Sequence, residues 1–100
     1  MTGKRYSAPR RVDANHSEIV AAFRAFGFSV ADTHALPGFV DLVVGKWGHV
    51  VLVEIKTPAG AVSGSQALFR ANWRGGYWLV RSADDVAAQY RGFIRMCGED

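Results

Sequence analysis

Two apolar runs rich in β-branched residues, FVDLVVG at 39–45 and HVVLVEIK at 49–56, constrain the fold of this chain most strongly. The short connection between them contains a glycine, which predicts an antiparallel hairpin with Gly48 at a positive φ angle. If the turn is centred on this connection, the register places Asp41 opposite Glu54. The hairpin therefore carries two acidic residues as cross-strand neighbours at its open end.

Charged residues emerge at the end of a strand that is otherwise apolar. Side chains alternate along a strand, so Glu54 and Lys56 share one face, while Val53 and Ile55 share the other. Directly opposed residues have Cβ atoms about 5 Å apart, and two carboxylates at that distance destabilise a sheet unless positive charge lies between them. A divalent cation such as Mg²⁺, which prefers oxygen ligands, is the obvious candidate.

The remaining pattern predicts helices and strands in a fixed order around this hairpin. Helical periodicity over 16–26 ends at Gly27, a short strand is expected over 28–34, and a second helix over 63–74 ends at a pair of glycines. The segment YWLVR at 77–81 predicts a further strand, and Ser82 is a good N-cap for a last helix. The expected order is αβββαβα, in a chain whose 100 residues suggest one folded domain.

The net charge of +3 is modest, but the cations are unevenly distributed. The first eleven residues hold four cations and no acid, which predicts a flexible basic arm over 1–14 ahead of a folded domain over 15–100. An anionic partner such as nucleic acid fits this arm, and a frayed terminus without function is the alternative. The cations of the arm are Lys4, Arg5, Arg10 and Arg11.

Cysteine usage and hydropathy limit the cellular setting. Cys97 is the single cysteine, so no intrachain disulfide is possible and a reducing cytoplasm fits. No apolar run approaches the ~20 residues that a membrane-spanning helix requires. We therefore expect a soluble protein without a membrane partner.

The acidic pair and Lys56 form a recognisable pattern. GFVD followed by VEIK resembles the PD-(D/E)xK nuclease superfamily, and Gly60, Ser63 and Gln66 followed by the strand YWLVR extend the likeness to the virus-type replication-repair nuclease family, VRR-NUC. The resemblance covers approximately residues 15–90 and agrees with the predicted order of elements. One departure is Val40, which stands where the superfamily has a proline before the metal-binding Asp.

The resemblance implies a restriction-endonuclease-like core, in which helices flank a mixed sheet, and a hydrolase that cleaves phosphodiester bonds. Asp41, Glu54 and the backbone carbonyl of Ile55 would bind Mg²⁺ or Mn²⁺, which polarises a phosphoryl oxygen and acidifies bound water. Lys56 would orient or deprotonate that water, or neutralise charge in the transition state. An exposed ion pair at a hairpin end is the alternative without function.

Two further polar residues match the family pattern and have a structural alternative. In relatives an acid on the first helix approaches the metal, which makes Glu18 a catalytic candidate, but Asn15 and Glu18 also have the spacing of a capping box. Gln66 is a catalytic candidate near the Lys, and Ser63 with Gln66 has the same capping-box spacing. Helical spacing also groups Gln66 with Arg70 and Arg74 in a polar stripe, which either binds phosphates or is a solvated helix face.

The histidines and tryptophans give weaker indications. His16, His34 and His49 lack the spacing of zinc ligands, so zinc coordination is not expected, and His34 is expected to be a surface residue or to lie near the substrate. Trp47 at the hairpin tip either stacks on a base or packs locally. Four other aromatic residues are expected in the core: Phe69, Trp73, Trp78 and Phe93.

Taken with the resemblance, the sequence predicts a metal-dependent DNA endonuclease that selects DNA structure in the manner of a Holliday-junction resolvase. A non-catalytic DNA-binding module of the same fold and a nuclease subunit of a larger repair complex are the alternatives. The small stand-alone relatives imply a homodimer. Its contact is either a stripe on the last helix, formed by Val86, Tyr90, Phe93 and Ile94, or the hairpin around Trp47. The expected location is the cytoplasm of a bacterial or phage-infected host cell.

Overall fold

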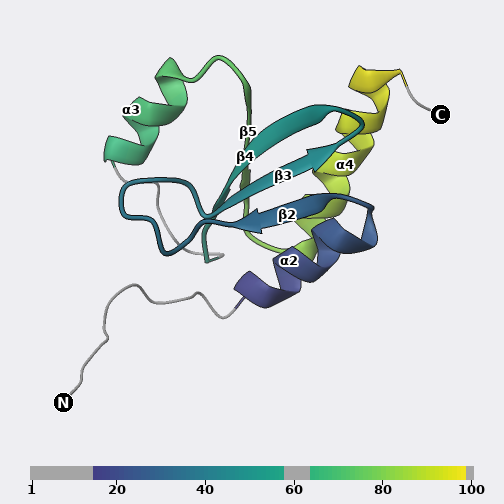
Figure 1. Ribbon diagram of the computed structural model, residues 1–100, viewed down its shortest axis with the longest axis horizontal. Coiled ribbons are helices and arrows are strands. Elements are labelled where there is room, and N and C mark those ends of the chain that lie inside the picture. Colours follow the sequence, from purple (N-terminus) through teal and green to yellow (C-terminus); the bar gives the residue numbers. More distant parts are fainter. Residues whose placement is uncertain (1–14, 58–63, 99–100) are drawn as a thin grey trace.

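The computed structural model describes residues 15–57 and 64–98, and within these ranges it contains the predicted αβββαβα order (Figure 1). Side chains of residues 64–66 lie outside the description, as do residues 1–14, which include the basic arm. The elements are α2 (His16–Ala25), β2 (Ser29–Asp32), β3 (Leu42–Lys46), β4 (His49–Ile55), α3 (Gly64–Asn72), β5 (Gly76–Val80) and α4 (Ala83–Cys97).

The four strands form one mixed sheet in the order β2-β3-β4-β5. The β2–β3 and β3–β4 pairs are antiparallel, while β5 runs parallel to β4 after the crossover through α3. The predicted hairpin is confirmed: Val43 pairs with Leu52, and Gly48 has a φ of +80°. Trp47 also has a positive φ of +54°, as a two-residue hairpin turn of type I′ requires.

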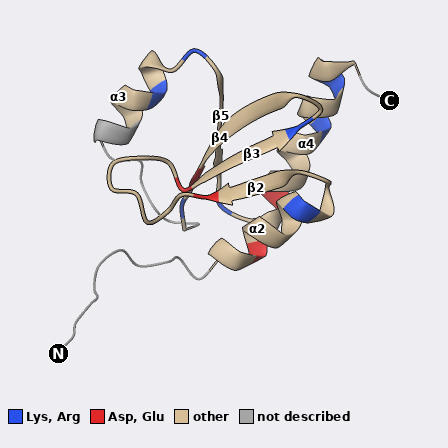
Figure 2. Ribbon diagram, in the orientation of Figure 1, with Lys and Arg blue, Asp and Glu red and all other residues tan. Residues whose placement is uncertain are grey.

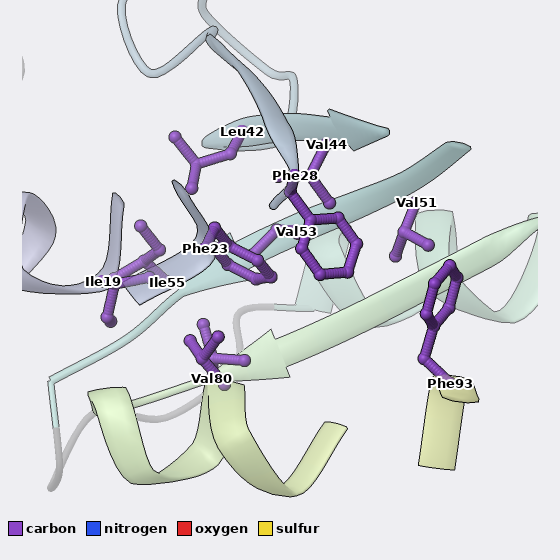
Figure 3. Close-up of a cluster of buried hydrophobic side chains, with 11 residues drawn as sticks. Ile19, Phe23, Phe28, Leu42, Val44, Val51, Val53, Ile55, Val80 and Phe93 are labelled. Carbon is purple, nitrogen blue, oxygen red and sulfur yellow. The ribbon is translucent and has the colours of Figure 1, made fainter. Parts of the chain in front are cut away.

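One face of the sheet carries the hydrophobic core together with α2 and α4 (Figure 3). Phe23 of α2, Val53 of β4 and Val86 of α4 are all fully buried there. In Figure 1, α3 stands apart from α2 and α4. Its Phe69 side chain contacts Tyr77 of β5. The buried cluster comprises Ile19, Phe23, Phe28, Leu42, Val44, Val51, Val53, Ile55, Val80, Val86 and Phe93.

Several sequence predictions about α3 and the aromatic residues need correction. The helix α3 ends at Asn72, so Arg74 does not belong to a helical stripe with Arg70. Trp73 is 42% exposed rather than buried, because it follows the helix and stacks on Phe69 at the surface. The prediction for Phe93 is confirmed, since it is buried in the core.

The last helix and the hairpin tip pack against each other. Ser82 caps α4 by accepting a hydrogen bond from the Asp85 N–H. Val86 and Phe93 of the predicted α4 stripe are buried against the sheet, so these two side chains serve the core. Trp47 stacks on Phe93 at 5.7 Å between ring centroids, which is the local packing that the sequence left open. No helix within the described ranges has the length and apolar content needed to cross a bilayer.

Candidate functional site

Acidic residues gather at the end of the sheet where β2 and β4 end and β3 begins (Figure 2). Asp41 directly precedes β3, and its N–H donates to the Val53 carbonyl at 3.0 Å. This bond is offset by one residue from the β3–β4 register, in which Leu42 pairs with Val53. Such an offset is typical of a β-bulge, which re-aims a side chain at a strand end. The Asp41 carboxylate accepts a hydrogen bond from the Ile55 N–H at 2.8 Å.

Glu54 lies on the sheet face opposite the core. It alternates with Val53 and Ile55, both core residues, and it is itself only 4% exposed. Tyr77 of β5 pairs with Leu52, so its side chain shares the face of Glu54, and its hydroxyl donates to Glu54 Oε1 at 3.4 Å. Glu54 is therefore a buried carboxyl group that accepts a hydrogen bond from Tyr77, and not the exposed acid of the alternative without function.

The pKa of Glu54 is raised from its ordinary value of 4.5 to about 7. Burial is the main cause, and the negative charge of Asp41 and a side-chain hydrogen bond with it act in the same direction. Lys56 and the Tyr77 hydroxyl act against the shift by favouring the charged form. In the absence of a cation, the Glu54 carboxyl group is thus partly protonated near neutral pH.

Burial also raises the pKa of Tyr77 to about 12, and the charge of Glu54 adds to this effect. The phenol therefore stays protonated at neutral pH and remains a hydrogen-bond donor to Glu54. The guanidinium of Arg70 lies 5.7 Å from the centre of the Tyr77 ring. This contact brings one cation of α3 to the edge of the acidic site.

Lys56 and the Ile55 carbonyl complete the arrangement. The ammonium of Lys56 lies 3.9 Å from Glu54 Oε2. The Lys56 N–H donates to the Val80 carbonyl of β5 at 3.0 Å. The Ile55 carbonyl belongs to the same trans peptide as this N–H and points in the opposite direction. The Ile55 carbonyl therefore faces away from β5, toward the side on which Asp41 lies.

The structure brings together Asp41, Glu54, Ile55 and Lys56, as their positions in the sequence suggest. Glu18 is exposed in the first turn of α2. Its capping-box alternative is wrong, because the Asn15 side chain does not cap α2. Asn15 Nδ2 instead donates to the carbonyls of Lys56 at 3.1 Å and Arg81 at 2.7 Å, which ties the start of α2 to the segments that follow β4 and β5.

The other predicted residues are only partly described. Gln66 lies in the first turn of α3, but its side chain and Ser63 are outside the described residues, so the capping-box alternative there stays a prediction. The four cations of the basic arm are also outside. Tyr77 was missed by the sequence analysis, because its position beside Glu54 depends on the register of a parallel pair joined by a long crossover.

A second polar cluster lies at the same end of the sheet, and the sequence analysis did not anticipate it. His16 of α2 and His34 both contact Asp32, the last residue of β2, although no sequence spacing groups them. His16 is buried at 6% exposure, and the His34 side chain is 28% exposed. The structure thus groups two histidines that the sequence spacing does not, and with Asp32 they could hold a metal ion. The expectation that zinc is not coordinated stays a prediction.

Comparisons of the chain with protein-family models, with curated proteins and with solved structures gave no match. The geometry of the described residues therefore carries the functional argument.

Proposed function

We propose that the chain is a metal-dependent phosphodiesterase that acts on DNA, a member of the VRR-NUC type with a PD-(D/E)xK core. The observation that carries this proposal is the convergence of Asp41, Glu54, Ile55 and Lys56 at one end of the β3–β4 hairpin. The mixed four-stranded sheet with flanking helices is compatible with that core.

The donor set fits a hard divalent cation such as Mg²⁺ or Mn²⁺. Glu54 is costly to ionise because it is buried and lies beside the charge of Asp41, and a cation that binds both carboxylates offsets that cost. The residues that would hold it are Asp41, Glu54 and the Ile55 carbonyl. When bound, the cation supplies Lewis acidity toward a phosphoryl oxygen and toward water.

The neighbouring side chains have distinct tasks in this proposal. Lys56 holds the attacking water or the developing charge on the phosphate, from a position beside Glu54. Tyr77 orients the Glu54 carboxylate through its hydroxyl. Burial of Glu54 keeps bulk water away from one side of the site and strengthens these interactions.

DNA is the proposed substrate because Lys56 and Arg70 lie beside the acidic site, where a bound cation would also attract a phosphate group. Arg70 lies beside Tyr77, and Arg74 together with the basic arm adds positive charge to the chain. A branched substrate and a two-fold homodimer extend the proposal, with the cytoplasm of a bacterial or phage-infected cell as its setting. A non-catalytic DNA-binding module of the same fold, or a nuclease subunit of a larger complex, is the second candidate.

The test is a cleavage assay with labelled four-way junction, flap, nicked and linear duplex DNA in Mg²⁺ or Mn²⁺. We expect cleavage of branched DNA by the wild type, and a loss of at least about 100-fold for Asp41→Ala, Glu54→Ala and Lys56→Ala. Glu18→Ala and Gln66→Ala decide whether these two residues belong to the catalytic group. Wild-type turnover by a folded Glu54→Ala protein would refute the metal site, while metal-independent binding without cleavage would favour the second candidate.

A further inference from the structure

We propose that His16, Asp32 and His34 form a second metal site, which takes a divalent transition metal such as Zn²⁺ and is distinct from the acidic site of Asp41 and Glu54. The three residues come from the start of α2, the end of β2 and the turn that follows β2. This inference does not depend on the proposed nuclease activity.

The ligand atoms converge on a single carboxylate. His16 Nε2 lies 3.0 Å from Asp32 Oδ2, and His34 Nδ1 lies 2.7 Å from Asp32 Oδ1. Each imidazole therefore contacts a different oxygen of the same group. The candidate ligand atoms all lie within 4.8 Å of one another, which is close enough for small side-chain movements to enclose one ion.

The ring geometry supports convergence rather than stacking. The two imidazoles are 5.0 Å apart between centroids and inclined at 63°, an edge-to-face rather than a stacked arrangement, and a nitrogen of each ring contacts Asp32. Burial restricts the movement of the His16 side chain. The backbone N–H of His34 donates to Asp32 Oδ1 at 3.2 Å, which holds the turn that carries His34. Two of the three ligands are therefore held by the fold before any metal binds.

The chemistry of the donors selects the class of metal. Two imidazole nitrogens and one carboxylate oxygen suit zinc and neighbouring first-row metals, whereas Mg²⁺ prefers oxygen ligands alone. A bound cation would replace the imidazole protons that now face the carboxylate. Each imidazole would stay neutral by carrying its proton on its other ring nitrogen. Three protein ligands also leave a coordination position for water or a further ligand.

The two clusters occupy opposite sides of the sheet. Asp32 pairs with Leu42, a core residue, so its side chain shares the face on which α2 packs. Glu54 alternates with core residues on β4 and lies on the other face. The two clusters therefore lie on different faces of the sheet and share no ligand, so the two sites can be separated by mutation.

The experiment uses the full chain, without an affinity tag that contains histidine, after removal of metal by a chelator. Zn²⁺ is added in a calorimeter, and Co²⁺ is added in a parallel sample whose visible d–d bands report coordination by nitrogen and a low coordination number. With Mg²⁺ present in large excess to fill the acidic site, we expect one Zn²⁺ per chain with a Kd of about 1 µM or tighter. The site should be indifferent to a large excess of Mg²⁺.

Matched variants assign the ion to its ligands. Asp32→Asn and His34→Gln should weaken Zn²⁺ binding by more than about 100-fold, because even the loss of an outer partner of a ligand costs 10–100-fold. Glu54→Gln and His49→Gln are the controls and should bind as the wild type does. Circular dichroism of each variant checks folding. In the wild type, the imidazole resonances of His16 and His34 should shift when Zn²⁺ is added, which gives a second measurement that needs no variant.

Two results would overturn the inference. One is the absence of Zn²⁺ binding by the wild type up to about 100 µM, well above the expected Kd, which would leave His16, Asp32 and His34 as a hydrogen-bonded tie between α2 and β2. The other is binding that survives Asp32→Asn and His34→Gln and is lost in Glu54→Gln, which would place the ion at the acidic site.

Discussion

Replacing Glu54 with Gln should shift the free energy of unfolding relative to the wild type, and this difference should increasingly favour the variant as the pH rises. Gln keeps the shape of the side chain and a group that can accept from Tyr77, but it cannot ionise. In the wild type, burial and the neighbouring Asp41 raise the pKa of Glu54 to about 7 in the folded state, against 4.5 ordinarily. The folded state therefore resists ionisation of Glu54, whereas the unfolded chain does not.

The sign and the size follow from this difference. A group with a raised folded-state pKa contributes stability that is fully present below pH 4.5 and is lost as pH rises through 7. Each tenfold change in proton affinity is worth about 1.4 kcal/mol, so the change from 4.5 to about 7 corresponds to about 3 kcal/mol. The free energy of unfolding of Glu54→Gln minus that of the wild type should therefore increase by up to about 3 kcal/mol between about pH 4 and pH 8.5.

Urea denaturation in chelator, followed by tryptophan fluorescence at several pH values, measures this difference. Glu18→Gln is the matched control, because it makes the same substitution at an exposed carboxyl group instead of a buried one. Adding Mg²⁺ should stabilise the wild type at pH 8.5 and leave Glu54→Gln nearly unchanged, since a bound cation replaces the proton. A difference that stays constant with pH, or falls as pH rises, would refute the assignment of Glu54 as a carboxyl group that is costly to ionise.

Three further predictions test neighbouring features. Tyr77→Phe should raise the pKa of Glu54 further, because the hydroxyl that is lost favours the ionised carboxylate. An NMR titration of the Glu54 side-chain carbonyl carbon measures this pKa, and a lowered value would contradict the prediction. Asn15→Ala should lower the free energy of unfolding, measured with urea, by about 1–3 kcal/mol, because two hydrogen bonds are lost. Asn72→Ala, which removes an exposed hydrogen bond, should lower it less, and equal effects would show that the Asn15 hydrogen bonds add no stability. Deleting residues 1–14 should make the salt dependence of DNA affinity shallower by up to about three to four in log-log slope, whereas an unchanged slope would show that its four cations contact no phosphate.

The sequence was sufficient to predict the local part of the acidic site. Asp41 and Glu54 belong to one hairpin, whose short turn at Trp47 and Gly48 fixes the register between the strands. Their proximity therefore needs no knowledge of the rest of the fold. The bulge-like offset at Asp41 was not predicted, because it depends on the Ile55 N–H capturing the carboxylate.

The sequence was not sufficient where contacts join distant elements. Tyr77 reaches Glu54 only because β5 runs parallel to β4 in one particular register, and the α3 crossover leaves that register open. His16 and Asp32 meet only because α2 packs beside the end of β2. Hydrophobic periodicity predicts which face of a helix is buried, but not which strand end its first turn will approach.

Three of the long-range hydrogen bonds begin at the start of α2. Asn15 binds the backbone just after β4 and β5, and the next residue, His16, turns to the end of β2. One helix terminus thus fixes the backbone of Lys56 on one side and a ligand of the histidine cluster on the other. The two proposed sites are separate in their ligands, but they depend on the same anchored turn, so a change at Asn15 should disturb both, whereas a change at Glu54 or His34 should disturb one.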